Sequence, residues 1–435
     1  MSSTSRRPDS VLLDTHAVAG IQRSSTTACG STRNGKTIEV SLFAENPPCP
    51  SKLFVHSPDM SPTVPPTIVC TEDDLLLLRV DMIRERLPIS PVHCDYFIYR
   101  ASVPSLEMLQ RPHPFFHDCD VGVLPRPDGH YSVAALVTTS TPGLYNLHLF
   151  HSDVSSWSSR SVSVGAPQRE FPVEIPPDSC RLHHHFTSNV IAIGGESGTM
   201  GWVDLWRGIL FCDVLDESSC SLRGVPLPLP LKELSYNNGN GVKFGSPVQH
   251  RGIVFIRDKG CLKFVHLEIS DVRLPGNDPE TGAPSFRSDN WVLTTWSNAK
   301  MTDSFEDWDK DYTVQASDIP IDSTRISQAL ENGPLHRSQD NGLVAEQLAL
   351  HNLSMSQPAP CVNGKDVVYL VARKKFMHLK AWILAVDMVK GELQDVVEFG
   401  TRRQFGPSVI YRPSRISRFM NLVKKYTNPP TTPGK

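Results

Sequence analysis

Residues 202–215 read WVDLWRGILFCDVL, two apolar runs on either side of an Arg207-Gly208 break. Valine, isoleucine and aromatic residues favour strands, and a glycine inside such a run marks a tight turn. The polar residues 216–219, DESS, then provide a second turn before the next run. This pattern predicts successive antiparallel strands joined by short turns.

The same kind of unit returns along the chain. Residues 252–267 read GIVFI, then the turn RDKG, then CLKFVHL. Residues 366–387 contain the runs DVVYLVA and AWILAVD. The clearest hairpin lies within residues 127–150, where the turn PDG precedes YSVAALV and its partner YNLHLF. Each of these units predicts two or more paired strands.

The spacing of these units suggests a structural repeat. We take Tyr131, Ile209, Ile253 and Val367 as the first apolar residues of equivalent inner strands. The separation of Ile209 and Ile253 then matches the roughly 40–50 residues of one propeller blade. We therefore expect an all-β fold, a β-propeller-like array of antiparallel strand-turn-strand blades. The number of blades stays open.

Composition sets the class of protein. The chain has 435 residues, of which 39% are hydrophobic and 20% charged, as in a soluble globular protein. The net charge of −3 gives no overall attraction to nucleic acid or to an anionic membrane. Residues 1–7 do not resemble a secretory signal, and the ten cysteines form no Cys-x-x-Cys pair. We expect reduced thiols in an intracellular protein, cytoplasmic or nuclear and not secreted.

We divide the chain into three parts. Residues 1–36 are rich in Ser and Thr and are expected to be a mobile N-terminal tail. Residues 37–412 are expected to form a single β-propeller-like domain, with loop-rich insertions near 271–290 and 317–341. Residues 413–435 are expected to be a basic C-terminal tail that contains a short helix.

The C-terminal segment is the strongest charged feature. From Thr401 onward it carries eight Lys and Arg residues and no Asp or Glu, and its apolar residues recur at helical spacing. A basic amphipathic helix can bind an acidic protein, a membrane surface or nucleic acid. It can equally pack its apolar stripe on the β domain. The candidate partner-binding residues are Arg415, Arg418, Phe419, Lys424 and Lys425.

The residues around 201–215, together with LRGVPLP at 222–228, carry a family resemblance. With 291–296 and 366–370 they resemble an uncharacterised plant family expanded in grasses, the domain-of-unknown-function 1618 family, over a signature block of about 201–370. The family has no established activity or catalytic residue. Its strand pattern is similar to the propeller-like domains that follow F-boxes in plant ubiquitin-ligase adaptors. This chain departs from those adaptors because its first 40 residues show no F-box helices.

One motif matches a nucleotide-binding loop. Residues 30–37, GSTRNGKT, fit the pattern G-x-x-x-x-G-K-[ST], which cradles phosphates when a buried strand precedes it and a helix follows. Here a polar stretch precedes it, and Ile38, Val40 and Leu42 alternate as in a strand. We predict a turn at Asn34-Gly35 that opens a hairpin. The alternative is a nucleotide-binding enzyme that uses Gly30–Thr37, with Lys36 as its phosphate ligand.

Other clusters resemble functional sites, and we interpret each as a loop. An acidic series resembles a calcium loop but has Tyr312 where glycine is required. Two His and Cys groups have possible metal ligands, and a Gly-rich stretch misses the serine-nucleophile pattern by one position. We expect no metal and no cofactor. The members are Asp307, Asp309, Asp311 and Asp318; Cys180 and His183–His185; His113, His117 and Cys119; and Gly194–Gly198.

These observations predict a non-enzymatic protein-interaction platform with an unidentified protein partner. The alternatives are the nucleotide-binding enzyme and a small-ligand binder that uses the central channel of the propeller. Nucleic acid is not an expected partner, except through the basic C-terminal tail. Four tryptophans are expected to pack in blade cores: Trp202, Trp206, Trp291 and Trp296.

Overall fold

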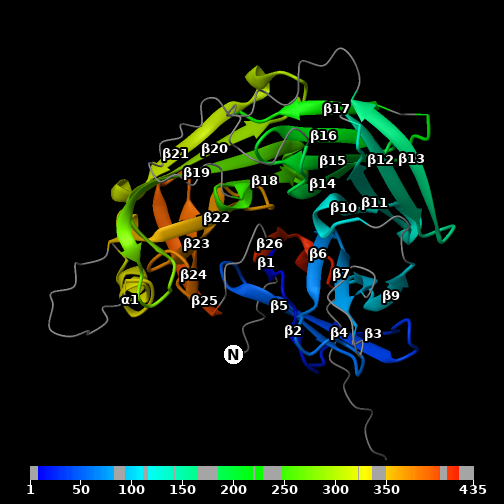
Figure 1. The fold of residues 1–435 in the computed structure, drawn as a ribbon, viewed down its shortest axis with the longest axis horizontal. Coiled ribbons are helices and arrows are strands. Elements are labelled where there is room, and N and C mark those ends of the chain that lie inside the picture. Colours follow the sequence, from blue (N-terminus) through cyan, green and yellow to red (C-terminus); the bar gives the residue numbers. More distant parts are fainter. Residues whose placement is uncertain are drawn as a thin grey trace, which may run out of the picture.

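The computed structural model describes residues 8–82, 94–110, 116–141, 143–164, 185–218, 221–228, 246–321, 323–335, 349–401 and 409–420. Within these ranges the chain forms six blade-like sheets arranged as a ring, coloured from blue through green to red in Figure 1. Five are antiparallel four-stranded meanders, in which each strand pairs with the next. The sixth joins the beginning of the chain to its end. The expectation of an all-β, propeller-like fold is confirmed.

The meanders follow one another along the chain. The first contains β6 (Thr67–Glu72), β7 (Leu75–Asp81), β8 (Cys94–Arg100) and β9 (Ser105–Leu109). The second contains β10 (Val121–Pro125), β11 (Tyr131–Thr138), β12 (Leu144–His151) and β13 (Ser156–Val164). The third contains β14 (Asn189–Gly194), β15 (Thr199–Asp204), β16 (Gly208–Asp213) and β17 (Ser221–Pro226). A short parallel pairing of β13 with β17 makes the second and third into one eight-stranded sheet.

Two more meanders complete the left side of Figure 1. The fourth contains β18 (Arg251–Ile256), β19 (Cys261–Asn277), β20 (Pro284–Asn298) and β21 (Asp309–Gln315). The fifth contains β22 (Ser354–Pro360), β23 (Val367–Arg373), β24 (Lys380–Asp387) and β25 (Glu392–Thr401). The α-helix of the described residues, α1 (Thr324–Asn332), lies between them in sequence and buries Ile326 and Leu330.

The closing sheet has the order β26-β1-β5-β4-β3, and β2 also pairs with β5. Its strands are β1 (Val11–Asp14), β2 (Val18–Ala19), β3 (Ala28–Ser31), β4 (Thr37–Phe43), β5 (Pro50–His56) and β26 (Tyr411–Ser414). The first strand of each meander and β26 lie toward the middle of the ring. Going around the ring from β6 to β26, each of these inner strands contacts the next one. A bridge from His16 to Thr67 joins the closing sheet to β6, so the ring is continuous.

The expected tail boundaries at 36 and 413 are wrong. Residues 11–14 form β1, which pairs antiparallel with β26 from Val11↔Ser414 to Asp14↔Tyr411. Val11, Leu12 and Leu13 are fully buried because apolar clusters cover both faces of β1, with Val11 and Leu13 in one cluster and Leu12 in another. A three-residue apolar run is too short to show a period, which is why its surroundings indicated a polar tail. At the other end, β26 extends to Ser414, past the expected boundary.

The proposed blade register is also wrong. Ile253 does begin near the start of the inner strand β18, but Tyr131 and Val367 lie in second strands, and Ile209 lies in a third strand. The three misplaced strands, β11, β16 and β23, are buried on both faces, so each is a mostly apolar run that gives no sign of its place in the blade. The hairpin of 131–150 itself is confirmed as β11 and β12.

The four tryptophans lie in the core, as predicted. Trp202 and Trp291 are fully buried, and Trp206 and Trp296 nearly so. The Trp202 indole donates to the Asp120 carbonyl at 2.7 Å, and the Trp291 indole donates to the Leu350 carbonyl at 3.1 Å. Each ring therefore fills space between neighbouring elements while its single polar atom keeps a partner.

The first expected insertion is not a loop. Residues 271–290 continue β19 and β20 outward as a two-stranded ribbon, with irregular register near Ser270 and Arg273. The second, near 317–341, contains α1, and its last residues lie outside the described ranges. Of the expected C-terminal helix, the described residues contain a 3-10 turn over Ile416–Arg418, and residues 421–435 lie outside the described ranges. Among the described residues, no helix has the length and apolar character needed to cross a membrane.

Candidate functional site

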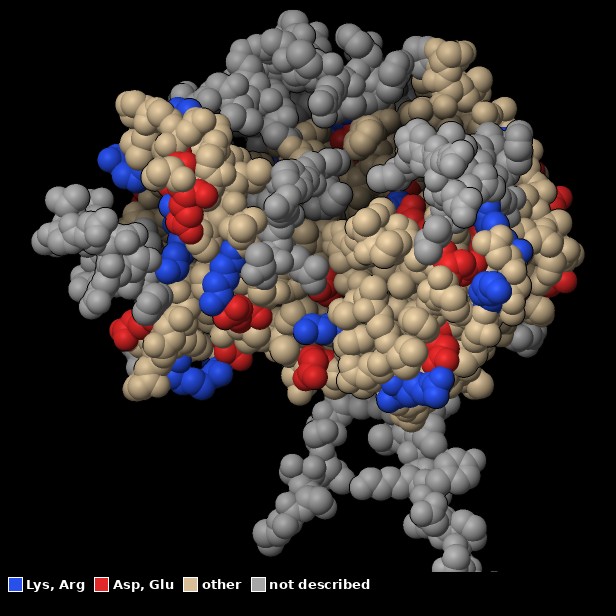
Figure 2. Space-filling model, turned by 60° about the horizontal axis from the view of Figure 1, so that its bottom comes forward, with Lys and Arg blue, Asp and Glu red and all other residues tan. Residues whose placement is uncertain are grey.

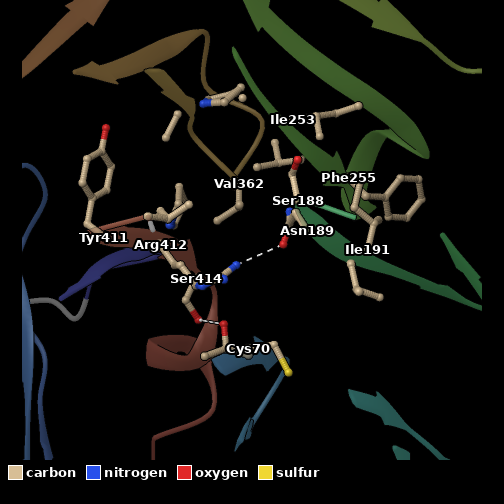
Figure 3. A pocket seen from close by; sticks show the side chains of 18 of the residues that line it. Cys70, Ser188, Asn189, Ile191, Ile253, Phe255, Val362, Tyr411, Arg412 and Ser414 are labelled. Carbon is tan, nitrogen blue, oxygen red and sulfur yellow. Dashed lines mark hydrogen bonds between the residues drawn. The ribbon is translucent and has the colours of Figure 1, made fainter. Parts of the chain in front are cut away.

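The middle of the ring holds a cavity of about 160 Å³. Its walls come from inner strands of blades that are far apart in sequence: β6, β14, β18, β22 and β26 (Figure 3). Apolar side chains such as Val362, Ile191 and Ile253 form much of the lining. The middle of the ring thus contains a partly open cavity of small-molecule size, which we call the channel.

Two hydrogen bonds join β26 to inner strands that are far from it in sequence (Figure 3). Arg412 on β26 donates from Nη1 to Asn189 Oδ1 at 3.0 Å. Thr71 on β6 donates from Oγ1 to Ser414 Oγ at 3.0 Å. Because the two bonds join three inner strands, they fix the width of the channel on this side.

An ion-pair network occupies one mouth of the channel. We call it the mouth network; its members are Glu72, Asp73, Arg257, Asp258, Arg415 and Arg418. Glu72 ends β6, while Arg257 and Arg415 follow the last residues of β18 and β26. Inner strands of a ring run in the same direction, so their carboxyl ends meet at one face. Arg257 reaches Glu72 at 2.6 Å and Arg415 reaches Asp73 at 2.5 Å, so the network bridges across the ring.

Burial changes the ionisation of groups along the channel. It raises the pKa of Glu72 above its ordinary value, although the nearby Arg257 acts in the opposite direction. It raises the pKa of the Cys70 thiol to about 12, so this thiol stays protonated near neutral pH. Outside the channel lining, the Cys94 thiol donates to Asp81 at 3.0 Å, and burial likewise raises the pKa of this thiol to about 12. These groups are therefore suited to structural hydrogen bonds and ion pairs.

The nucleotide-loop motif forms the predicted hairpin. Residues 30–37 span the end of β3, a turn and the start of β4, with Thr32 and Lys36 linked by a backbone bond of 2.8 Å. Gly35 has φ +72°, which a turn requires, and the Asn34 amide donates to Asp59 at 2.9 Å. A strand follows Thr37, so its backbone amides serve the sheet, whereas a phosphate loop needs a helix there.

The acidic series is distributed over different local structures. Asp309 and Asp311 lie on β21, and Asp311 pairs with Lys263 at 3.0 Å. Asp307 lies in the preceding 3-10 turn and accepts from the Thr302 backbone at 3.1 Å. The described residues contain no group of three or more His, Cys, Asp or Glu side chains placed to hold a metal ion.

The histidine groups are only partly within the described residues. Cys180, His183, His184 and His113 lie outside them. His185 is buried beside Tyr145, and burial lowers its pKa to about 4. His117 precedes a short turn in which the Cys119 thiol contacts Asp120 at 3.7 Å. The Gly-rich stretch 194–198 is a turn with positive φ at Gly194, Gly195 and Gly198, as predicted.

The candidate partner-binding residues of the C-terminal segment lie in different surroundings. Arg415 and Arg418 belong to the mouth network, and Phe419 is half-buried beside them. Ile416 and Met420 pack into the core of the closing sheet and the first meander, which is the packing alternative stated above. Lys424 and Lys425 lie outside the described residues.

Sequence reasoning missed the channel residues Arg412, Asn189, Thr71 and Ser414. The available signal was an arginine inside the short run YRPS, since a cation within a buried strand needs a special environment. This signal is hidden because Arg412 is one of eight Lys and Arg residues after Thr401 and therefore resembles part of a basic tail.

Among curated proteins, none matches this chain. Solved structures give weak likenesses. A prolyl endopeptidase has 11% identity and a TM-score of 0.24, covering 88% of this chain and 51% of its own. This chain thus spans about half the length of that protein. The WD40 domain of SCAP from fission yeast has 8% identity and a TM-score of 0.31, covering 90% and 89%. An α-L-arabinanase of Penicillium chrysogenum has 8% identity and a TM-score of 0.26, covering 92% and 89%.

The family comparison concerns the third, fourth and fifth meanders. Residues 202–369, from β15 to β23, match the model of a family described as a protein of unknown function, DUF1618. This block coincides closely with the signature of about 201–370, so the resemblance is confirmed. The DUF1618 family model therefore describes the region from β15 to β23 of this chain, residues 202–369.

Proposed function

We propose that the protein is a non-enzymatic interaction platform and that the outer half of the β19–β20 hairpin is its contact surface. We call residues 271–288 the arm. The observation that carries the proposal is a preformed, exposed ribbon that extends beyond the four-stranded part of its blade. The partner is proposed to be a protein, because a ribbon with free edges suits contact with another polypeptide.

The arm has free edges. β18 pairs with β19 only as far as His266, and β21 pairs with β20 only from Val292. Among the described residues, neither edge of the arm has a strand partner beyond those points. Natural proteins usually cover or shorten such edges, because an open edge pairs with other chains. Its outer face also exposes Val272 (42%) and Leu274 (36%).

The arm is held in one conformation by its neighbours. Lys375, on the turn between β23 and β24, lies 2.8 Å from both Asp278 and Glu280. The rings of Phe286 and Phe376 meet edge to face at 5.2 Å between centroids. Because the ribbon is already ordered, a partner that binds it has little conformational entropy to remove.

Several observations support a role without catalysis. The carboxylates at the channel mouth are matched to arginines, and the channel thiol Cys70 is held protonated by burial. Lys and Arg side chains are interspersed with Asp and Glu on the face in Figure 2, a pattern of mixed charge that suits protein contacts. The cysteines that the structure describes are all free thiols, which supports a place inside the cell.

The test is a pull-down with quantitative mass spectrometry, using the wild-type chain and the double variant Val272→Ser/Leu274→Ser. Val154→Ser/Val389→Ser is the matched control, since those valines are 63% and 60% exposed on turns of other blades. We expect a protein that the control retains to be depleted at least about tenfold by the arm variant, the scale of a binding hot spot. That protein, purified, should show the same ratio of Kd values.

Equal capture by the arm variant and the control would overturn the arm as the contact surface. Turnover of a substrate by the purified chain, abolished by a single channel substitution, would overturn the non-enzymatic role. Thermal unfolding of both double variants checks that they remain folded.

A further inference from the structure

Arg412 carries a charge that the described residues do not balance. Its guanidinium makes one hydrogen bond, to Asn189, and its Nε is buried without an acceptor. The arginines of the mouth network differ, because Arg257 and Arg415 pair directly with Glu72 and Asp73. Arg251 also lines the cavity, but it donates to the Leu205 carbonyl at 2.8 Å and its guanidinium lies over the Trp206 ring. An arginine that faces a cavity without a carboxylate partner is unusual, because removing its charge from water is costly.

The electrostatic surroundings agree with the geometry. Burial lowers the pKa of Arg412 below its ordinary value, and the opposing effects of Cys70, Asp118 and Cys119 do not cancel it. Of these, Asp118 is already engaged: it pairs with Arg79 and accepts from the Tyr96 hydroxyl at 3.1 Å. A bound anion would supply the missing negative charge at Arg412.

The polar groups around Arg412 could donate hydrogen bonds to the two oxygens of a bound carboxylate. The Arg412 Nε is a buried donor without an acceptor in the described part of the chain, and the Asn189 side chain, which carries an amide nitrogen donor, already contacts Arg412 through its Oδ1. A carboxylate can accept from two such donors at once. Ser414, two residues after Arg412 on β26, adds a hydroxyl to the lining and accepts a hydrogen bond from the Thr71 hydroxyl (Figure 3).

The rest of the lining sets the size and nature of the ligand. Val254, Ala359 and Val362 contribute apolar surface, and Val362 points into the space near Arg412 in Figure 3. A cavity of about 160 Å³ resembles an engineered apolar cavity of about 150 Å³ that holds benzene. A phosphate would set additional charged oxygens against these apolar walls and near Glu72.

We propose that the central channel binds a small monocarboxylate with an apolar body, whose carboxylate pairs with Arg412 and Asn189. The proposal goes beyond the platform role and does not depend on the arm. The Val272→Ser/Leu274→Ser variant is accordingly expected to bind such ligands as the wild type does.

The test is isothermal titration calorimetry of the full chain at fixed ionic strength. The probes are benzoate and isovalerate, each paired with its neutral amide. We expect at least one acid to bind at least about tenfold more tightly than its amide, the scale of a charge-assisted hydrogen bond. Arg412→Gln should remove that preference. Failure of both acids to bind, equal binding of acid and amide, or an unchanged preference in Arg412→Gln would overturn the proposal.

Two further variants keep the test decisive. Arg418→Gln removes an exposed cation of the mouth network and should leave the preference for the acid unchanged. Val362→Phe fills the channel without changing charge and should weaken acid binding at least about tenfold. If Arg412→Gln does not fold, unchanged binding by Val362→Phe overturns the channel as the site, and loss of binding supports it.

Discussion

At the scale of single residues, this protein keeps several titratable side chains neutral inside the ring. Burial lowers the pKa of His185 to about 4, of His250 to about 4 and of His266 to about 2. The unfolded chain binds a proton at each of these rings near pH 6.5, whereas the folded chain does not. Between about pH 4 and 6.5 the unfolded state therefore binds more protons, and stability falls as the pH is lowered.

We expect His185→Phe to reduce this pH dependence. The ring lies against Tyr145 and neither of its nitrogens has a hydrogen-bond partner in the described residues, so phenylalanine keeps the shape and removes the titration. The slope of unfolding free energy against pH should fall by about 1.4 kcal/mol per pH unit within the window of 4 to 6.5. Urea denaturation at a series of pH values measures it, and a slope equal to that of the wild type would contradict the assignment.

A second residue-scale expectation concerns Gly252 on β18. A Cβ at this position would lie 2.0 Å from the Pro358 carbonyl oxygen on β22, and a backbone atom has little freedom to move away. We expect Gly252→Ala to lower the unfolding free energy by about 1–3 kcal/mol through overpacking. Chemical denaturation checks this, and an unchanged midpoint would show that the two inner strands can separate at no cost.

At the scale of elements, the arm depends on a neighbouring turn for its order. Lys375 bridges Asp278 and Glu280, and the Arg273 guanidinium donates within the arm to the carbonyls of Gly276 at 2.8 Å and Ser285 at 2.9 Å. The ion pairs of Lys375 attach the arm to the fifth meander, and the hydrogen bonds of Arg273 hold the bend within the arm.

We expect Lys375→Met to loosen the arm without unfolding the molecule. The two ion pairs are partly exposed, so their loss should cost less than about 1 kcal/mol of global stability. Hydrogen exchange should nevertheless become faster in residues 271–288 while the inner strands stay protected. Faster exchange throughout the ring, or none in the arm, would contradict this account.

At the scale of the whole molecule, the C-terminal segment is part of the ring. Ile416 is fully buried in the cluster that also contains Val11 and Leu13. We expect Ile416→Ala to cost about 2–5 kcal/mol and to shift a single unfolding transition seen by both fluorescence and circular dichroism. Arg418→Ala, at an exposed ion pair, is the control and should shift it little. A detached tail would give no change for either variant.

The sequence alone predicts the all-β class of the fold, but it does not predict the strand pairing that closes the ring. Runs such as 131–138 and 145–150 predict strands because both faces are buried in similar apolar surroundings. For the same reason they do not reveal which strand of a blade they form. The β1–β26 pairing joins residues about 400 positions apart, and neither short strand has a detectable period.

The candidate site was harder to predict than the fold. The hairpin at Gly30–Thr37 followed from the residues around it, since a strand pattern after Thr37 excludes a phosphate loop. Arg412 and Asn189 meet only because the ring brings β26 beside β14. A contact of this kind depends on tertiary closure, which local propensity and spacing do not contain.

The seam between β1 and β26 also determines how the protein responds to mechanical force. The two strands are antiparallel, and Val11, at the start of β1, lies opposite Ser414, at the end of β26. A pull on the two ends of the chain therefore loads this one end of the ladder and opens its bonds one after another. Peeling of this kind needs less force than shearing all the bonds together. Tension on the chain is therefore expected to open the ring by separating β1 from β26, the strand that carries Arg412.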